Sequence, residues 1–202
     1  MDIKIAQALG PIKLSLMDTA VVASSRRLKI YGNDVPCKPG CAGCCSRLIR
    51  ITMAEATILY EHLVQNGEWT EVRKEARDQF SLVKEVDPVA WFKMNRSCPV
   101  LNPKTRNCRG YAVRPAFCST HFVTSSPDLC DPWNAADGIY QPVDMDDLME
   151  IFSKRVSENV AGYGIFGLEL ALPVALLLAE RISVQSGLEL DQAVKLLFRE
   201  FA

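Results

Sequence analysis

CKPGCAGCC, residues 37–45, places four cysteines within nine residues of a 202-residue chain. A metal site needs thiolates that converge on one point, and cysteines two to four residues apart in a loop with glycine and proline can converge in this way. Four more cysteines lie downstream, so the pattern predicts a metal centre to which two distant segments contribute. The predicted metal ligands are Cys37, Cys41, Cys44, Cys45, Cys98, Cys108, Cys118 and Cys130, with His121 as a further candidate three residues after Cys118.

The adjacency of Cys44 and Cys45 restricts the kind of metal centre. Adjacent cysteines point in divergent directions, so we do not expect both to bind one mononuclear tetrahedral ion. The pair favours a polynuclear cluster or two separate ions. Eight cysteines are enough for two four-cysteine iron–sulfur clusters or two tetrahedral zinc ions, and one cluster with spare thiols is equally open. Ligand type alone does not decide between zinc and iron, because soft thiolates suit both.

Composition and charge exclude several classes of partner. Hydrophobic residues make up 49% and charged residues 23%, which allows a real core without cysteine staples. The net charge of −1 shows no basic excess, so we expect no nucleic-acid binding. The first residues, MDIKIAQALGPIKLSLM, lack the continuous apolar core and cleavage site of a secretory signal. We therefore expect a cytoplasmic protein with reduced thiols, whose partner is another protein.

Helical patterns surround the cysteine-rich segment. Thr52 and Glu55 form a capping box that predicts a helix ending at Gly67, and a further helix is expected over 68–86, stopped by Asp87-Pro88. Prolines recur between 95 and 141 without any helical period, as expected of a segment constrained by metal. A helix start is predicted near Met145, and further helices are predicted over 15–30, 167–186 and 191–201. The helix over 15–30 is predicted from the apolar residues Leu14, Met17, Val21, Val22 and Leu28.

These patterns predict a mainly α fold in which helices flank a central, irregular, cysteine-rich metal-binding segment. We expect a single domain over 1–202, with the metal-binding segment at 35–130 and C-terminal helices at 143–202. The apolar segment Val160–Ala179 is long enough to span a membrane. Glu169 near its middle and Pro173 inside it argue for a buried helix, so no membrane span is expected.

The three cysteine motifs together resemble the YkgJ-type cysteine cluster family, also called the CxxCxxCC family. The family pattern is C-x2/3-C-x2-C-C, then C-P-x-L, then C-x-x-Y-x-x-R-P-x-x-C. Here it reads CKPGCAGCC, then CPVL at 98–101, then CRGYAVRPAFC at 108–118, so the resemblance covers about residues 37 to 130. The family is described as a zinc- or iron-chelating domain. The cluster is also similar to that of flagellin lysine N-methylase, which implies an iron–sulfur centre and makes it our first choice of cofactor, with zinc as the alternative.

The same resemblance draws attention to Tyr111 and Arg114, which we predict as cofactor-binding residues. Arg114-Pro115 can aim Cys118 through a rigid turn, and the guanidinium can offset thiolate charge. A surface ion pair for Arg114 and simple packing for Tyr111 are the alternatives. The chain departs from the family at Ser119, where arginine is common. It is also much shorter than the methylase and has no evident G-x-G-type nucleotide loop, so methyl transfer is not carried over.

Three functions fit these observations. The first is a cytoplasmic metal-cluster protein, with iron–sulfur preferred, that has a redox or protein-modification-related role. The second is a structural zinc-binding module for protein interaction. The third is a cluster-dependent enzyme, radical S-adenosylmethionine-like or methylase-associated, because Cys37-x3-Cys41-x2-Cys44 also matches the radical S-adenosylmethionine motif. That enzyme class needs a large partial β/α barrel, and the sequence has no alternating strand–helix pattern.

Overall fold

The computed structural model describes residues 3–32, 35–130, 142–161 and 165–184, with the single residues 192, 195 and 199. The described chain is mainly helical, which confirms the predicted fold class. The predicted helix at 191–201 lies outside the described ranges. The α-helices are α1 (Ile3–Tyr31), α2 (Met53–Gln65), α3 (Trp69–Glu85), α4 (Pro88–Lys93), α5 (Ala116–Thr120), α6 (Asp146–Asn159) and α7 (Leu172–Val184), and three short 3-10 turns are η2 (Gly43–Ser46), η3 (Tyr111–Val113) and η4 (Pro127–Cys130).

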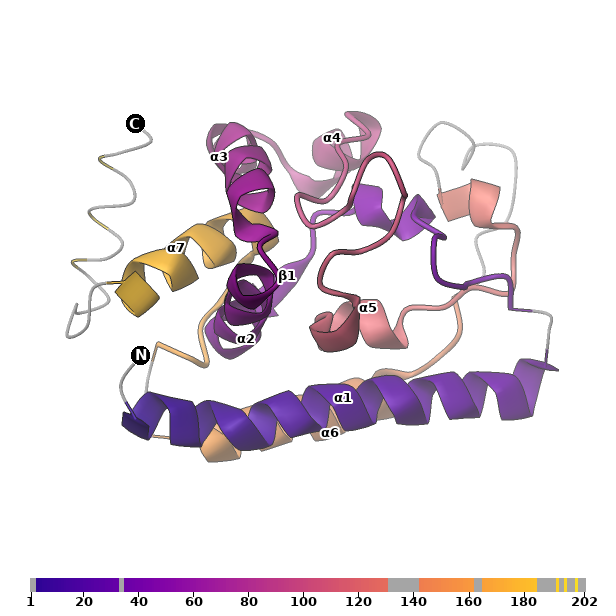
Figure 1. The fold of residues 1–202 in the computed structure, drawn as a ribbon. Helices are drawn as coiled ribbons and strands as arrows, with labels where there is room; N and C mark the ends of the chain where they lie inside the picture. Colours follow the sequence, from indigo (N-terminus) through magenta and orange to yellow (C-terminus); the bar gives the residue numbers. More distant parts are fainter. Residues whose placement is uncertain are drawn as a thin grey trace.

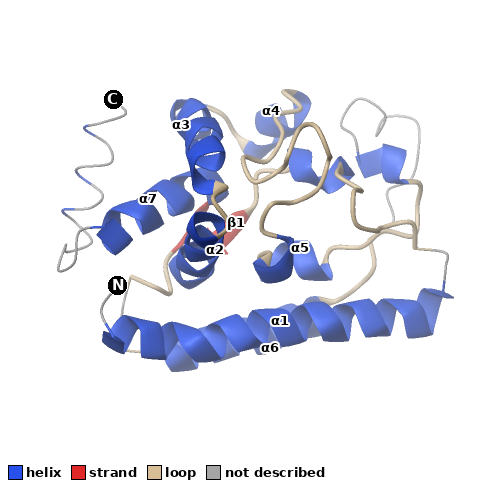
Figure 2. Ribbon diagram, viewed as in Figure 1, coloured by secondary structure: helices blue, strands red, loops and turns tan. Residues whose placement is uncertain are grey.

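The helices form two groups with the cysteine-rich segment beside them. The long helix α1 runs along one edge of the molecule with α6 next to it, while α2, α3 and α7 pack together on the other side (Figure 1). Loops and short helical turns fill the region around α5 (Figure 2). One main hydrophobic core joins α1, α2, α3, α6 and α7, and it includes Leu16, Leu63, Phe80, Phe152 and Leu176.

The predicted capping box starts α2. The Thr52 hydroxyl accepts a hydrogen bond from the Glu55 backbone N–H at 3.2 Å, and the Glu55 carboxylate accepts from the Thr52 backbone N–H at 2.8 Å. Two backbone donors at the helix start are thereby satisfied. Leu59 and Leu63 on this helix are buried in the core, as its apolar periodicity predicts.

Two prolines that the sequence marks as helix breakers lie at helix starts. Asp87-Pro88 ends α3 but also begins α4, because the Asp87 carboxylate accepts hydrogen bonds from Val89 N–H and Ala90 N–H at 2.8 and 3.0 Å. Pro173 lies in the first turn of α7, where a missing backbone donor costs no helical hydrogen bond.

The apolar segment after residue 160 is only partly helical. Helix α7 begins at Leu172 rather than near residue 167, because the preceding residues form a strand. This strand, β2 (Glu169–Ala171), pairs antiparallel with β1 (Arg50–Thr52), in the register Arg50↔Ala171. The sequence analysis predicted neither strand. Within the described residues, no helix is long and apolar enough to cross a membrane.

Helix α1 differs most from expectation. It begins at Ile3 rather than near residue 15, and the apolar residues that predicted it lie largely on its solvent side. Leu14 and Val21 are each 65% exposed and Leu28 is 52% exposed. The face that packs on the core instead carries Leu9, Ile12, Leu16 and Ala23. The helix is therefore apolar on two faces, of which only one is covered in the described chain.

Candidate metal centre

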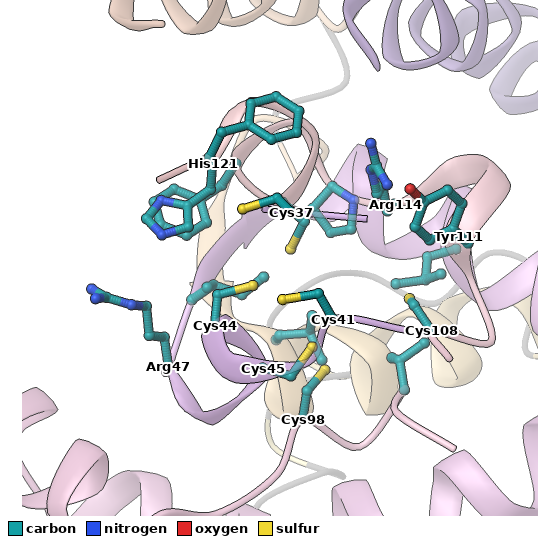
Figure 3. Close-up of a pocket in the computed structure, with 18 of the residues that line it drawn as sticks. Cys37, Cys41, Cys44, Cys45, Arg47, Cys98, Cys108, Tyr111, Arg114 and His121 are labelled. Carbon is teal, nitrogen blue, oxygen red and sulfur yellow. The ribbon is translucent and has the colours of Figure 1, made fainter. Parts of the chain in front are cut away.

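Seven of the eight cysteines line one cavity of about 120 Å³. A single water needs about 10–15 Å³ of such space, so the cavity has room for a larger group. Figure 3 shows the sulfurs of Cys37, Cys41 and Cys44 turned toward the same space. His121, Tyr111 and Arg114 also lie on the wall. The cysteines of the wall are Cys37, Cys41, Cys44, Cys45, Cys98, Cys108 and Cys118.

The first four cysteines are brought together by a tight turn and a short 3-10 turn. Gly40 has φ of +86°, a conformation that favours glycine, and it lets the Cys41 N–H donate to the Lys38 carbonyl at 2.9 Å. The chain then enters η2, where the Cys45 N–H donates to the Ala42 carbonyl at 3.1 Å. The glycine and proline of the motif thus fold the loop so that all four of its thiols reach one wall.

Cys98 and Cys108 reach the cavity through direct backbone contacts. The Cys98 N–H donates to the Cys45 carbonyl at 2.6 Å, so the downstream segment is joined to the first cysteine loop. The chain then turns back on itself: Leu101 and Cys108 form an isolated antiparallel bridge, and the Arg109 N–H donates to the Val100 carbonyl at 2.9 Å. This local hairpin places Cys108 beside Cys98 on the cavity wall.

Cys118 lies on α5, a helix that the sequence analysis assigned to irregular structure. The start of this helix is held by Glu55, whose carboxylate accepts the Ala116 N–H at 2.9 Å. Glu55 is only 5% exposed, and burial raises the pKa of its carboxyl. The same side chain therefore caps α2 and positions α5. Sequence reasoning found the capping box but missed this second contact, because 61 residues separate the two partners.

Cys130 does not line the cavity, although burial and then the charges of Cys44 and Cys41 raise the pKa of its thiol to about 11. It ends η4, is 3% exposed, and packs against Gly43 at the start of η2. A Cβ atom at Gly43 would lie 2.7 Å from the Cys130 Cβ and 3.0 Å from the Pro127 carbonyl oxygen. Glycine is thus required for the close approach of η2 and η4. Ligation by Cys130 and by the other candidates stays a prediction.

The model of the family described as "CxxCxxCC: Putative zinc- or iron-chelating domain" matches residues 36–136, half of the chain. The chain belongs to the CxxCxxCC family. The match confirms the resemblance seen in the motifs and spans all eight cysteines and His121. No curated protein and no solved structure matches the chain.

Two pairs of thiols in the CxxCxxCC loop share protons. The Cys37 thiol donates a hydrogen bond that lowers the pKa of Cys41 to about 6, while the pKa of Cys37 itself is raised. Cys45 lowers the pKa of Cys44 in the same way and has its own pKa raised. In each pair, one sulfur thus loses its proton more readily than its neighbour does.

The deeper thiols of the CxxCxxCC centre have raised pKa values for a different reason, which is mainly burial. Burial raises the pKa of Cys98 to about 12 and the pKa of Cys118 well above its usual value, and the negative charge of nearby thiolates adds to both shifts. Any metal that binds these sulfurs must displace protons. Burial, followed by the charge of Arg47, lowers the pKa of His121 to about 4, so this imidazole is neutral and able to ligate at pH 7.

The donors surround the CxxCxxCC cavity rather than one point in it. Among the residues that the structure describes, no three cysteine, histidine, aspartate or glutamate side chains are grouped so that they can hold a metal ion as they stand. Zinc–sulfur bonds of about 2.3 Å in a tetrahedron bring the sulfurs to about 3.8 Å from one another. Binding of one zinc ion would therefore require the thiols to rotate inward, whereas a multi-atom cluster can contact thiolates that lie farther apart.

Cations near the CxxCxxCC thiols can offset thiolate charge. Lys38, Arg47 and Arg114 lie on the cavity wall. Arg114 stacks on the Tyr111 ring, with its guanidinium carbon 4.1 Å from the ring centroid, and its Nε donates to the Ser119 hydroxyl at 3.1 Å. Both predicted cofactor-binding residues thus lie at the cavity and contact each other. Ser119, the departure from the family pattern, orients the guanidinium.

Proposed function

We propose that this chain is an iron–sulfur protein with a redox or protein-modification-related role in the cytoplasm, acting on or with another protein. The cluster would be held by thiolates of the cysteine segment at 35–130, within a single domain over 1–202. The observation that supports this most is the arrangement of seven thiols around one cavity. Iron–sulfur clusters are held by cysteine thiolates, commonly four per cluster.

The wall of the cavity also supports a cluster. Besides the thiols, the lining is mainly apolar, and exclusion of water tunes the potential of a bound cluster. When bound, a cluster of this kind supplies one-electron transfer. Tyr111 is 44% exposed and lies on the wall, so its side chain can meet a partner protein at the cavity mouth. The apolar lining includes Ile49, Leu59, Val100, Phe117, Phe122 and Leu172.

The deeper half of the cavity is the better candidate for cluster ligation. Burial raises the pKa values of Cys98, Cys108 and Cys118, and the charge of Cys44 adds to all three shifts, so these sulfurs lie near Cys44. Several mutually close thiolates in an apolar cavity require a bound cation to balance their charge. We therefore propose Cys44, Cys45, Cys98, Cys108 and Cys118 as the group from which cluster ligands are drawn, with Cys37, Cys41 and His121 nearer the outer part of the site.

The test is purification under strictly anaerobic conditions, followed by iron, acid-labile sulfide and zinc analysis and absorption spectroscopy. We expect brown protein with iron and sulfide in about equal amounts. The Cys98→Ser variant should lose most of its iron and sulfide, whereas the control Ser97→Ala, one residue away, should retain both. Colourless protein with stoichiometric zinc and no sulfide would overturn the proposal.

A structural zinc site is the second candidate, and the family description itself supports it. In that case zinc would hold the irregular segment together as a surface for protein interaction. The radical S-adenosylmethionine-like enzyme is not supported, because the sheet in the described residues has only two antiparallel strands. A β/α barrel requires many parallel strands.

A further inference from the structure

The exposed face of α1 has a strict seven-residue repeat. Leu14, Val21 and Leu28 are 65%, 65% and 52% exposed, and Met17, between the first two, is 44% exposed. In heptad terms Leu14, Val21 and Leu28 occupy a positions. The d positions are Gly10, Met17, Ser24 and Tyr31. Apolar residues at a and d form the seam along which two helices of a coiled coil pack.

This seam lies opposite the face of α1 that packs on the core. Ile12, Leu16 and Ala23 are buried and occupy c and f positions of the same repeat. Figure 1 shows α1 along the edge of the molecule, with the other labelled elements above or behind it. The exposed apolar residues of the seam run from Leu14 to Leu28, which is two heptads and about 21 Å at 1.5 Å per residue. A second helix can therefore pack on α1 without displacing the core.

The charges beside the seam match those of a second, parallel copy of the same helix. Lys13 occupies a g position and Asp18 the following e position, and both are exposed. In a parallel pair of helices, a g residue faces the e residue five positions later on the partner. Two-fold symmetry thus brings each Lys13 to the Asp18 of the other copy. In an antiparallel pair, g faces g, and the g residues Lys13, Ala20 and Arg27 offer no opposite charges.

We propose that two copies of this chain form a parallel homodimer in which the two α1 helices pack along the seam of Leu14, Met17, Val21 and Leu28. A second copy is favoured because its α1 carries the same apolar seam and because Lys13 of each copy faces Asp18 of the other. A lipid surface is a poorer occupant, because the acidic Asp18 lies directly beside Met17 at the apolar stripe, where helices that bind membranes carry basic residues. The dimer does not depend on which metal the cysteines bind.

The test is sedimentation-equilibrium ultracentrifugation of the full chain, with Val21→Glu compared against Val22→Glu. The two valines are neighbours on one helix, and both are exposed, at 65% and 45%, but only Val21 lies on the seam. We expect a dimer for the unaltered chain and for Val22→Glu. Val21→Glu removes two buried valines per dimer, so its dissociation constant should rise by at least about 100-fold. Circular dichroism should be the same for both variants.

Charge exchange tests the parallel direction. Asp18→Lys places lysine opposite Lys13 of the other copy and should weaken the dimer by about 3–10-fold, because two exposed pairs become repulsive. Adding Lys13→Glu to that variant restores opposite charges and should recover most of the affinity. A monomeric unaltered chain at 100 µM would overturn the proposal, as would equal effects of Val21→Glu and Val22→Glu. Binding of a monomer to phosphatidylglycerol vesicles through these residues would identify a lipid surface instead.

Discussion

Single side chains connect the helical core to the cysteines, and Glu55 is the clearest example. Its carboxylate caps α2 and accepts the Ala116 N–H at the start of α5, which carries Cys118. A buried acceptor that serves two helices cannot be removed without leaving a buried donor unpaired, which costs about 1–3 kcal/mol. The position of Cys118 thus depends on a residue far from the cysteine motifs.

Glu55→Ala should lower the free energy of unfolding by about 1–3 kcal/mol, because the N–H groups of Thr52 and Ala116 lose their acceptor. Urea denaturation followed by circular dichroism measures the change. Glu75→Ala, at an exposed position on α3, is the control and should change stability by less than about 0.5 kcal/mol. Equal stability of the two variants would show that the Glu55 contact to α5 is unimportant.

The buried thiols give metal binding a predictable pH dependence. The pKa of Cys98 is raised to about 12 and that of Cys118 well above its usual value, so both are protonated at pH 7. Each proton displaced by metal should raise the apparent affinity about tenfold per pH unit while the pH lies below the thiol pKa. Competition with a chelator of known affinity between pH 6 and 8 measures the slope. An affinity independent of pH would mean that the metal does not displace protons from these thiols.

At the scale of elements, the metal centre depends on close contact between short turns rather than on long helices. Turn η2 carries Cys44 and Cys45, and η4 packs against it at Gly43. A Cβ at Gly43 would meet both a side-chain carbon and a backbone carbonyl, and the backbone cannot simply rotate away. The approach of the two turns is therefore sensitive to a single methyl group.

Gly43→Ala should destabilise the protein by about 1–3 kcal/mol through overpacking and should reduce the metal content of the purified protein. Gly167→Ala is the control, because the added Cβ would have only an ordinary contact of 3.7 Å with Val160. Thermal unfolding and metal analysis of both variants provide the comparison. If Gly43→Ala retained full stability and metal, η4 would not be required to hold η2 in place.

At the scale of the whole molecule, the main core and the cysteine segment share buried side chains at Val100, Val113 and Ala116, but most of the core comes from the long helices. The core joins α1, α2, α3, α6 and α7 through buried aliphatic and aromatic side chains. The segment from Cys98 to Cys118 has short turns, one isolated bridge and few helical hydrogen bonds. Such a segment belongs to the low-stability part of a protein unless something else holds it.

Removal of metal by a chelator should therefore loosen residues 98–118 and leave the helical core folded. Hydrogen exchange followed by mass spectrometry should show faster exchange in that segment and little change in α2 and α7. The circular dichroism signal of the helices should fall only slightly. Cooperative unfolding of the entire chain on chelation would instead mean that the metal is needed for the core as well.

The local sequence determined those features whose partners lie within a few residues. Thr52 and Glu55 predicted the start of α2, and CKPGCAGCC predicted a loop that gathers four thiols. Both depend on contacts within one turn of chain, which neighbouring residues specify directly. Segments with helical periodicity on both sides of a proline-rich segment were likewise enough to predict the mainly α fold class.

Tertiary structure alone decided which distant groups meet. Glu55 and Ala116 are 61 positions apart in the sequence. The strands β1 and β2 pair residues that are up to 121 positions apart. The apolar residues of α1 predicted a helix, but only packing showed that Leu9, Ile12 and Leu16 face the core and Leu14, Val21 and Leu28 face outward. The periodicity of apolar residues predicts that a helix has an apolar face. When a helix has two such faces, the packing of the rest of the chain decides which one is buried.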